Sequence, residues 1–225
     1  MSSRLIFTDA AAAADALTFA GRTARLGDEA VRLQASGGTL LMTAAPLAPR
    51  GLFDATPTVL AMRALPVDPE LVCDLVVSAG SLQPADDDAA HLVLPDTALS
   101  PSWAGVTPPR AGWTEIAEVP ASVLASRAQW GIAAVAEALP QDSGEDAVRA
   151  VRAAVWGAPD EALGGIPLGA AFAAFVLGFI VGEEQAAVRE AGAWTRLSLV
   201  RGHVVVRGPA RTGLTAVRST GAPVV

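Results

Sequence analysis

Side chains able to carry out covalent or acid–base chemistry are scarce in this chain. Its 225 residues include two histidines, His91 and His203, and one cysteine, Cys73, but no lysine, asparagine or tyrosine. Nucleophilic catalysis needs a nucleophile, a histidine base and an orienting acid, and the Gly-x-Ser-x-Gly turn that presents a serine nucleophile is missing. Without lysine there is no Schiff base and no P-loop lysine. We can assign no catalytic residue, and the sequence favours a protein that is not an enzyme.

Two short segments have compositions that could bind a metal or a phosphate. The acidic run 86–88 and His91 offer carboxylates and an imidazole, which bind hard or borderline cations. Their spacing matches no metal loop, however, and a solvated acidic turn explains them better. The run 164–169 is glycine-rich but lacks the Lys-Ser/Thr pair that completes a phosphate loop. We therefore expect no metal and no cofactor.

The clearest electrostatic feature is an excess of arginine at the C-terminal end. The last 35 residues contain five arginines and no acid, whereas the preceding 190 contain eleven arginines and twenty-three acids. Two apolar runs around Arg201 predict a hairpin that places Arg196 opposite Arg207, and like charges across a ladder are unfavourable unless an anion lies near them. The candidate anion-contacting residues are Arg196, Arg201, Arg207 and Arg211.

Three explanations for these arginines stay open. Carboxylates of the same chain or of a second subunit could neutralise them, which is the explanation that we favour. A phosphate, nucleic-acid or other anionic ligand is the second, and solvated arginines are the third.

A Pro- and Trp-rich segment, residues 96–120, divides the chain and shows no periodicity. Long structureless loops tend to be functional, so Trp103, Arg110 and Trp113 are candidate ligand contacts. Tryptophans that pin the loop to the domain are the alternative that we favour. The stretch WAGVTPPRAGW resembles part of uncharacterised proteins from GC-rich Gram-positive bacteria, and this resemblance implies no activity, cofactor or site.

Residues 1–95 mainly show the two-residue period of β-strands. Asp9 is placed to cap a helix over residues 10–26, and the runs 29–35 and 39–44, joined by Ser-Gly-Gly, predict a β-hairpin. Further strands are expected at 4–8, 59–65, 71–82 and 91–94. We predict an α+β fold in which an antiparallel, β-rich N-terminal layer with one helix is followed by a helical region and a C-terminal β-hairpin.

Beyond residue 120 the apolar period becomes that of an α-helix. A stripe from Leu124 to Leu139 predicts one helix, and Ser143 followed by Asp146 predicts the capped start of a second. The third helical signal is the run 162–182, which has no polar side chain.

The run 162–182 is long enough to span a membrane, but Pro167 starts a helix that we expect to continue into the amphipathic stretch ending at residue 190. Acids rather than basic clusters flank the run, so we predict a long, buried central helix and no membrane span. Its small residues let another backbone approach closely: Ala170, Ala174, Gly178 and Gly182. That backbone is either a helix of the same chain, which we favour, or the same helix of a second subunit, and the second case predicts a homodimer.

The predicted organisation is a β-rich part over 1–95, a crossover over 96–120 and a helical part with the basic hairpin over 121–225. The two halves could equally form one continuous domain.

A net charge of −7 argues against a generic nucleic-acid or anionic-membrane binder. The N-terminus lacks the apolar core of a signal peptide and one cysteine forms no intrachain disulfide, so we expect a cytoplasmic location. The residue usage indicates a GC-rich bacterial genome.

No motif identifies the function. The main hypothesis is a non-catalytic interaction or assembly protein that associates with itself or with an unidentified protein. One alternative is anion or nucleic-acid binding through the arginine-rich hairpin. The other is an enzyme that uses dispersed carboxylates, for which no pair can be named.

Overall fold

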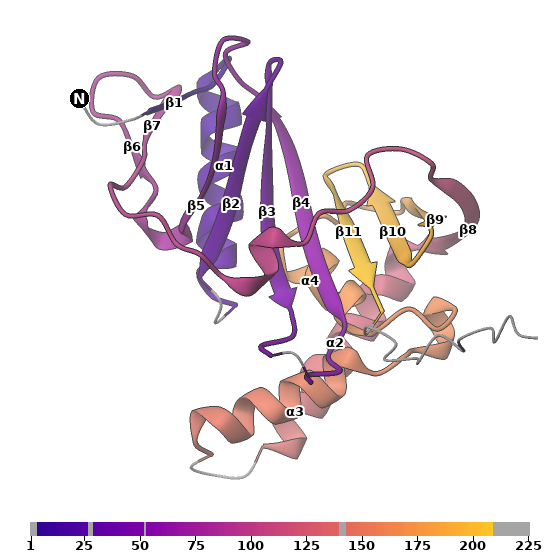
Figure 1. Ribbon diagram of the computed structural model, residues 1–225. Helices are drawn as coiled ribbons and strands as arrows, with labels where there is room; N and C mark the ends of the chain where they lie inside the picture. Colours follow the sequence, from indigo (N-terminus) through magenta and orange to yellow (C-terminus); the bar gives the residue numbers. More distant parts are fainter. Residues whose placement is uncertain (1–3, 27–28, 52, 140–142, 209–225) are drawn as a thin grey trace, which may run out of the picture.

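A computed structural model describes residues 4–26, 29–51, 53–139 and 143–208. Within these residues eight strands form one antiparallel sheet in the order β5-β2-β3-β4-β11-β10-β9-β8, and three short strands form a second sheet, β1-β7-β6 (Figure 1). The strands are β1 (Arg4–Ile6), β2 (Ala30–Ser36), β3 (Thr39–Leu47), β4 (Thr58–Pro66), β5 (Cys73–Ser78), β6 (Gln83–Pro84), β7 (His91–Val93), β8 (Thr114–Pro120), β9 (Gln185–Ala191), β10 (Trp194–Leu199) and β11 (Gly202–Arg207). The helices are α1 (Ala10–Thr23), α2 (Ala121–Ala138), α3 (Glu145–Gly157) and α4 (Gly169–Val176). The predicted α+β class is confirmed.

Helix α1 forms where the sequence predicts it. The Asp9 side chain accepts a hydrogen bond of 2.8 Å from the backbone N–H of Ala12, which satisfies one of the free donors at the helix start. Its buried side chains, including Ala16 and Phe19, belong to the main core beneath the sheet. The predicted hairpin of β2 and β3 is also present, and it turns at Gly37 and Gly38, both with positive φ.

The second helix of the C-terminal half starts differently from the prediction. Helix α3 begins at Glu145, and Gly144 rather than Ser143 occupies its N-cap position, without a side-chain cap. The expected capping box is therefore wrong, because the chain enters the helix one residue later.

The predicted long helix from residue 167 to 190 is wrong. Helix α4 ends at Val176, and Gly178 and Gly182 take positive φ angles of 73° and 59° in the connection that follows. Residues 185–191 then form strand β9, which pairs with β10 on one side and β8 on the other. Two ladders of backbone hydrogen bonds therefore outweigh the local helix preference of this alanine-rich stretch. Among the described residues, no helix is both long and apolar enough to cross a membrane.

Two small alanines of the apolar run pack within the chain. Ala170 and Ala174 are fully buried in the core, and α4 packs against α2. A methyl group on Gly169 would lie 2.9 Å from the carbonyl oxygen of Trp156 in α3. The close neighbour of this part of the run is therefore the same chain. Gly182 is exposed, and the homodimer stays a prediction.

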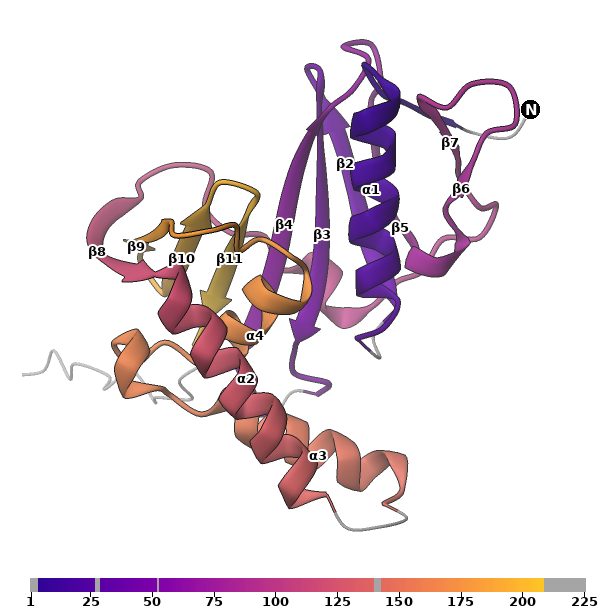
Figure 2. The same ribbon diagram turned by 180° about the vertical axis from the view of Figure 1, so that it is seen from behind.

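A seam between β4 and β11 joins the two halves into one sheet. These strands pair from Thr58 opposite Arg207 to Met62 opposite His203. On one side of the seam lie β3, β2 and β5, and on the other lie β10, β9 and β8. Helices α1 and α4 cover one face of the sheet, as the view from behind shows (Figure 2).

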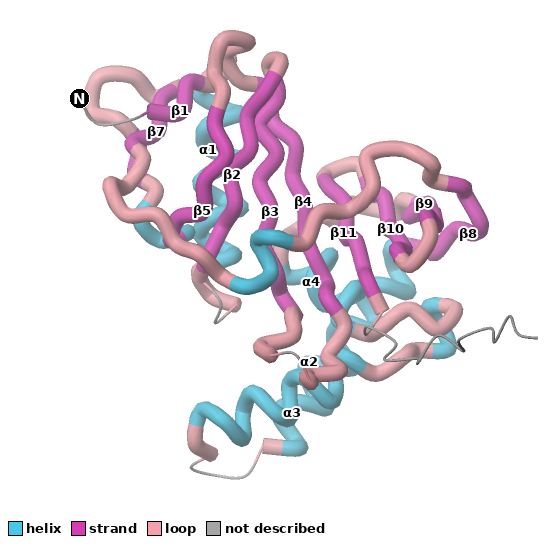
Figure 3. Tube along the Cα trace, in the orientation of Figure 1, coloured by secondary structure: helices cyan, strands magenta, loops and turns pink. Residues whose placement is uncertain are grey.

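On the opposite face, called the outer face below, the described residues place no α-helix, and the segment between β7 and β8 crosses it (Figures 1 and 3). This segment contains a short 3₁₀ turn at Ser102–Gly105 and is otherwise irregular until Thr114. The expected crossover over 96–120 is therefore too long, because its last seven residues form β8 at the edge of the sheet.

Candidate functional site

A cleft of about 520 Å³ lies between this crossover and the outer face of the sheet. We call it the aromatic–arginine cleft. Its charged and aromatic lining comprises Arg32, Asp74, Trp103, Arg110, Trp113, Arg196 and His203, and apolar side chains of β3, β4 and β11, such as Leu41, Leu60, Met62 and Val205, form its floor. Ligand pockets commonly combine such an apolar wall with a few polar groups and have volumes of this order.

The crossover is fastened to the sheet through two residues of its 3₁₀ turn. Trp103 is only 3% exposed and belongs to a small apolar cluster with Leu60 and Val205. Arg32 donates a hydrogen bond of 2.7 Å to the carbonyl oxygen of Ala104. Trp103 thus holds the crossover against the sheet, as the favoured alternative predicts, and it also lines the cleft.

Arg32 is neutralised within the cleft. Its Nε and Nη2 atoms each donate to a different oxygen of Asp74, at 2.8 Å, and Gln34 donates to the same carboxylate at 3.2 Å. The side-chain hydrogen bonds raise the pKa of Arg32 and lower the pKa of Asp74. This pair consequently leaves little charge for a ligand.

Arg196 differs because no carboxylate lies within ion-pair distance of it in the described part of the chain. Its guanidinium carbon lies 4.4 Å from the centre of the Trp113 ring, which is a cation–π contact. Directly across the ladder is Arg189 on β9, and Arg189 is itself paired with Glu115 at 2.5 Å. Burial and then the charge of Arg189 lower the pKa of Arg196.

Three buried polar atoms around Arg196 find no hydrogen-bond partner in the part of the chain that the structure describes: Nε of Arg196, Oγ of Ser198 and Nδ1 of His203. Ser198 and His203 lie directly opposite each other on β10 and β11. Buried polar groups are usually paired, so these three atoms make this patch of the sheet a candidate binding surface.

The geometry does not provide an activated nucleophile. Ser198 Oγ and His203 Nδ1 make no hydrogen bond to each other, and the groups that perturb His203 are arginines, not an acid. Burial, together with the charges of Arg196 and Arg189, lowers the pKa of His203. Burial also raises the pKa of the Cys73 thiol, which keeps it protonated and unreactive.

The candidate residues named from the sequence lie in different places. Arg110 is exposed at the rim of the cleft, whereas Trp113 is partly buried and donates from Nε1 to the carbonyl oxygen of Pro109 at 2.9 Å. Arg201 is exposed in the turn between β10 and β11. Arg207 is exposed, 5.8 Å from the Trp194 ring, and Arg211 lies outside the described residues.

The expected pairing of Arg196 with Arg207 is wrong. The two-residue turn at Val200 and Arg201 places Trp194 opposite Arg207 and Val205 opposite Arg196. The like charge beside Arg196 instead comes from Arg189, on a strand that was expected to be helical.

The acidic run 86–88 serves the small sheet. Asp87 accepts two hydrogen bonds from Arg4, at 2.6 and 2.8 Å, and His91 Nε2 lies 3.8 Å from Asp88. The run lies in the turn between β6 and β7, as an acidic surface loop would.

The residues that sequence reasoning missed are Arg32, Asp74, Ser198 and the cleft-lining position of His203. The alternation of Arg32 and Gln34 with apolar neighbours places both on one face of β2, but the sequence does not show which loop covers that face.

Two family models match successive parts of the chain. Residues 1–105 match the model of a domain of unknown function, DUF8010, and residues 108–211 match that of a second domain of unknown function, DUF8185. The boundary between the two matches falls inside the crossover. A search of curated proteins gives no match.

Solved structures of similar fold include bacterial sliding clamps. The DNA polymerase sliding clamp from Caulobacter crescentus shares 12% identity at a TM-score of 0.48, with 98% of this chain and 69% of that chain covered. The DnaN sliding clamp from Bartonella birtlesii bound to griselimycin shares 14% at 0.48, covering 93% and 66%. A putative DNA polymerase III beta subunit from Eubacterium rectale shares 7% at 0.48, covering 91% and 64%. The chain thus spans about two thirds of those chains, and at these scores we draw no functional conclusion from them.

Proposed function

We propose that this protein is a non-catalytic interaction protein that binds an acidic segment of a partner polypeptide in the aromatic–arginine cleft. The observation that carries the proposal is Arg196, a partly buried cation that contacts the Trp113 ring and has no carboxylate partner among the described residues. A carboxylate from a partner would gain a charge-assisted hydrogen bond from the free Nε atom.

The rest of the cleft suits the side chains that accompany such an acid. Leu60, Met62 and Val205 offer an apolar floor, and the prolines of the crossover offer an apolar wall. His203 adds a ring nitrogen that has no partner among the described residues. A polypeptide segment can supply an acid, apolar side chains and backbone hydrogen-bonding groups together, which a simple anion cannot.

Nucleic-acid binding has less support from the described residues. Nucleic-acid interfaces use many basic residues to contact phosphates along the strand. In the cleft, Arg32 is already paired with Asp74, and neither Arg201 nor Arg207 lines it. An enzymatic role has no support from the geometry either, because neither Ser198 nor His203 is activated.

The test is an NMR titration of isotope-labelled protein, in which the indole N–H signals of its five tryptophans are followed. The probes are short, end-blocked peptides with one aspartate among leucine and phenylalanine, and the same peptides with asparagine. We expect the Trp113 signal to move with the aspartate peptides and the Trp130 signal, on the distant helix α2, to stay in place.

The matched variants are Arg196→Gln and Arg25→Gln, because Arg25 is exposed and far from the cleft. We expect Arg196→Gln to weaken binding about tenfold and Arg25→Gln to leave it unchanged. Equal shifts with aspartate and asparagine peptides, or none at all, would overturn the proposal.

A second copy of the chain is one possible source of the acidic segment, which is how the predicted self-association would arise. Sedimentation of the wild type and of Arg196→Gln distinguishes the sources. A dimer that dissociates in Arg196→Gln supports self-association through the cleft. A strict monomer at about 100 µM contradicts the homodimer and assigns the segment to another protein.

A further inference from the structure

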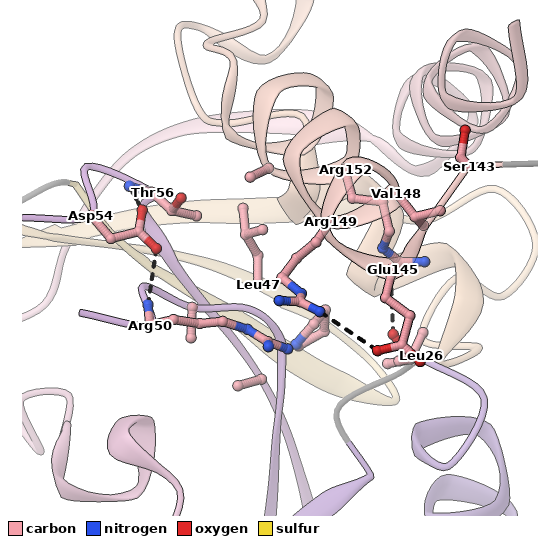
Figure 4. Close-up of a pocket in the computed structure, with 14 residues that line it drawn as sticks. Leu26, Leu47, Arg50, Asp54, Thr56, Ser143, Glu145, Val148, Arg149 and Arg152 are labelled. Carbon is pink, nitrogen blue, oxygen red and sulfur yellow. Dashed lines mark hydrogen bonds and ion pairs between the residues drawn. The ribbon is translucent and has the colours of Figure 1, made fainter. Parts of the chain in front are cut away.

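A second concavity, of about 630 Å³, lies on another side of the molecule, between the end of β3, the loop before β4, and helix α3. We call it the loop–helix pocket (Figure 4). It shares no lining residue with the aromatic–arginine cleft. Its lining contains three arginines from two parts of the chain: Arg50, Arg149 and Arg152.

Two of these arginines lack a carboxylate partner. Arg149 is balanced on its own helix by Asp146 at 2.7 Å and by Glu145 at 3.9 Å. Among the described residues, no carboxylate lies within ion-pair distance of Arg50 or Arg152. The side chains of Arg50 and Arg149 nevertheless extend toward each other across the pocket (Figure 4).

Arg152 is partly desolvated in this arrangement. It donates from Nη2 to the carbonyl oxygen of Leu26 at 3.1 Å and lies 5.8 Å from the Phe172 ring. Burial alone lowers the pKa of Arg152, and no neighbouring acid raises it. A cation removed from water without a counter-ion is unfavourable, and an anionic ligand would offset that cost.

The carboxylate of Asp54 does not take this role, although it lines the pocket. Its two oxygens accept backbone N–H groups, one from Arg50 and one from Thr56, each at 2.9 Å. A side-chain hydrogen bond with Thr56, and then these two backbone hydrogen bonds, lower the pKa of Asp54. Together they hold the loop that carries Arg50. The charge of Arg50 also lowers the pKa of Asp54, but the two side chains form no ion pair, and the main contact of Asp54 with this arginine is through the backbone N–H.

We propose that the loop–helix pocket binds the phosphate group of a small phosphate ester. A phosphate dianion can accept hydrogen bonds from several guanidinium groups at once, and the planar fork of arginine matches its oxygens. A single carboxylate would balance only one of the two unpaired arginines. The side chains of Leu47 and Val148 provide an apolar wall for the rest of the ligand.

The test uses phenyl phosphate as the probe, with benzoate and inorganic phosphate as comparisons, in calorimetric titrations of the full-length protein. We expect phenyl phosphate to bind more tightly than benzoate, because it carries the second negative charge. Tighter binding than inorganic phosphate shows that the apolar wall takes part, and equal binding restricts the site to the phosphate group itself.

Variants separate the site from the fold and from the cleft. Arg50 is exposed, so Arg50→Gln should fold normally and weaken binding about tenfold. Arg152→Gln should weaken it at least as much. The cleft variant Arg196→Gln, which changes no residue of this pocket, should leave it unchanged. Absence of saturable binding by phenyl phosphate, or unchanged affinity in folded Arg50→Gln, would overturn this proposal without affecting the proposed function.

Discussion

At the scale of single residues, the protonation of His203 makes the stability of the fold depend on pH. His203 is packed beside arginines and has a lowered pKa, whereas in the unfolded chain it has the ordinary value of 6.5. The unfolded state therefore binds the proton more readily. Above pH 6.5 the ring is neutral in both states, and its full contribution to the stability of the fold is present. As the pH falls from 6.5 toward the lower pKa of the folded state, only the unfolded chain gains the proton, and this contribution is lost.

We predict that the free energy of unfolding falls between about pH 7.5 and pH 5, and that His203→Gln removes part of this slope. Urea denaturation at a series of pH values measures it. His91→Gln is the control, because His91 belongs to the separate small sheet and should leave the contribution of His203 in place. If the free energy of unfolding changes with pH in the same way in the wild type and in His203→Gln, the pKa of His203 does not contribute to the pH dependence of stability.

At the scale of elements, the connection after α4 depends on a close approach to the hairpin of β10 and β11. Phe179 is 1% exposed, and its ring stacks with that of Phe19 at 6.1 Å between centroids. A methyl group on Gly202 would lie 2.7 Å from the Phe179 ring and 2.8 Å from the carbonyl oxygen of Met62. There is no space for a side chain at this position.

We predict that Gly202→Ala destabilises the protein by about 1–3 kcal/mol, as overpacking of a core does. Gly21→Ala is the matched change, because its methyl group would meet nothing within 4 Å in helix α1. It should stabilise by up to about 1 kcal/mol through helix propensity. Thermal unfolding of both variants measures the difference, and a neutral Gly202→Ala would contradict the close packing described here.

The elements that the sequence predicts correctly are those decided by neighbours in the chain. Helix α1 has its cap and its apolar period within one short stretch, and each predicted hairpin has its turn between two alternating runs. Strand β9 is different. Its alanines and charges favour a helix locally, and only its pairing with β8 and β10 makes it a strand.

The candidate site was predictable only in part, for the same reason. Trp113 and Arg196 could each be named from composition and position, but their contact depends on two long-range events. The crossover has to re-enter the sheet as β8, and β9 has to place Arg189 beside Arg196. Arg32 and Asp74 join the site through the pairing of β2 and β5, which no local pattern specifies.

At the scale of the whole molecule, the pairing of β4 with β11 joins the two halves in one continuous sheet. The seam buries Val59, Leu60, Val204 and Val205, so separating the halves would expose apolar strands on both sides. We propose that the two halves form one cooperative unit, although their sequences match two families.

We predict one calorimetric unfolding transition for the full-length chain, with equal van't Hoff and calorimetric enthalpies. Hydrogen exchange should give similar protection to β3 and β10, which lie on opposite sides of the seam. Two resolved transitions would show that the halves unfold independently.

The two edge strands of the long sheet, β8 and β5, affect how readily the protein aggregates. An edge strand exposes unpaired backbone groups that can recruit strands of other molecules. Strand β8 interrupts this template with a bulge between Glu115 and Ala117 and ends in Pro120. At the opposite edge, Leu99 of the crossover donates to the carbonyl oxygen of Val76. Both borders therefore resist edge-to-edge growth into fibrils, even though more than half of the chain is apolar.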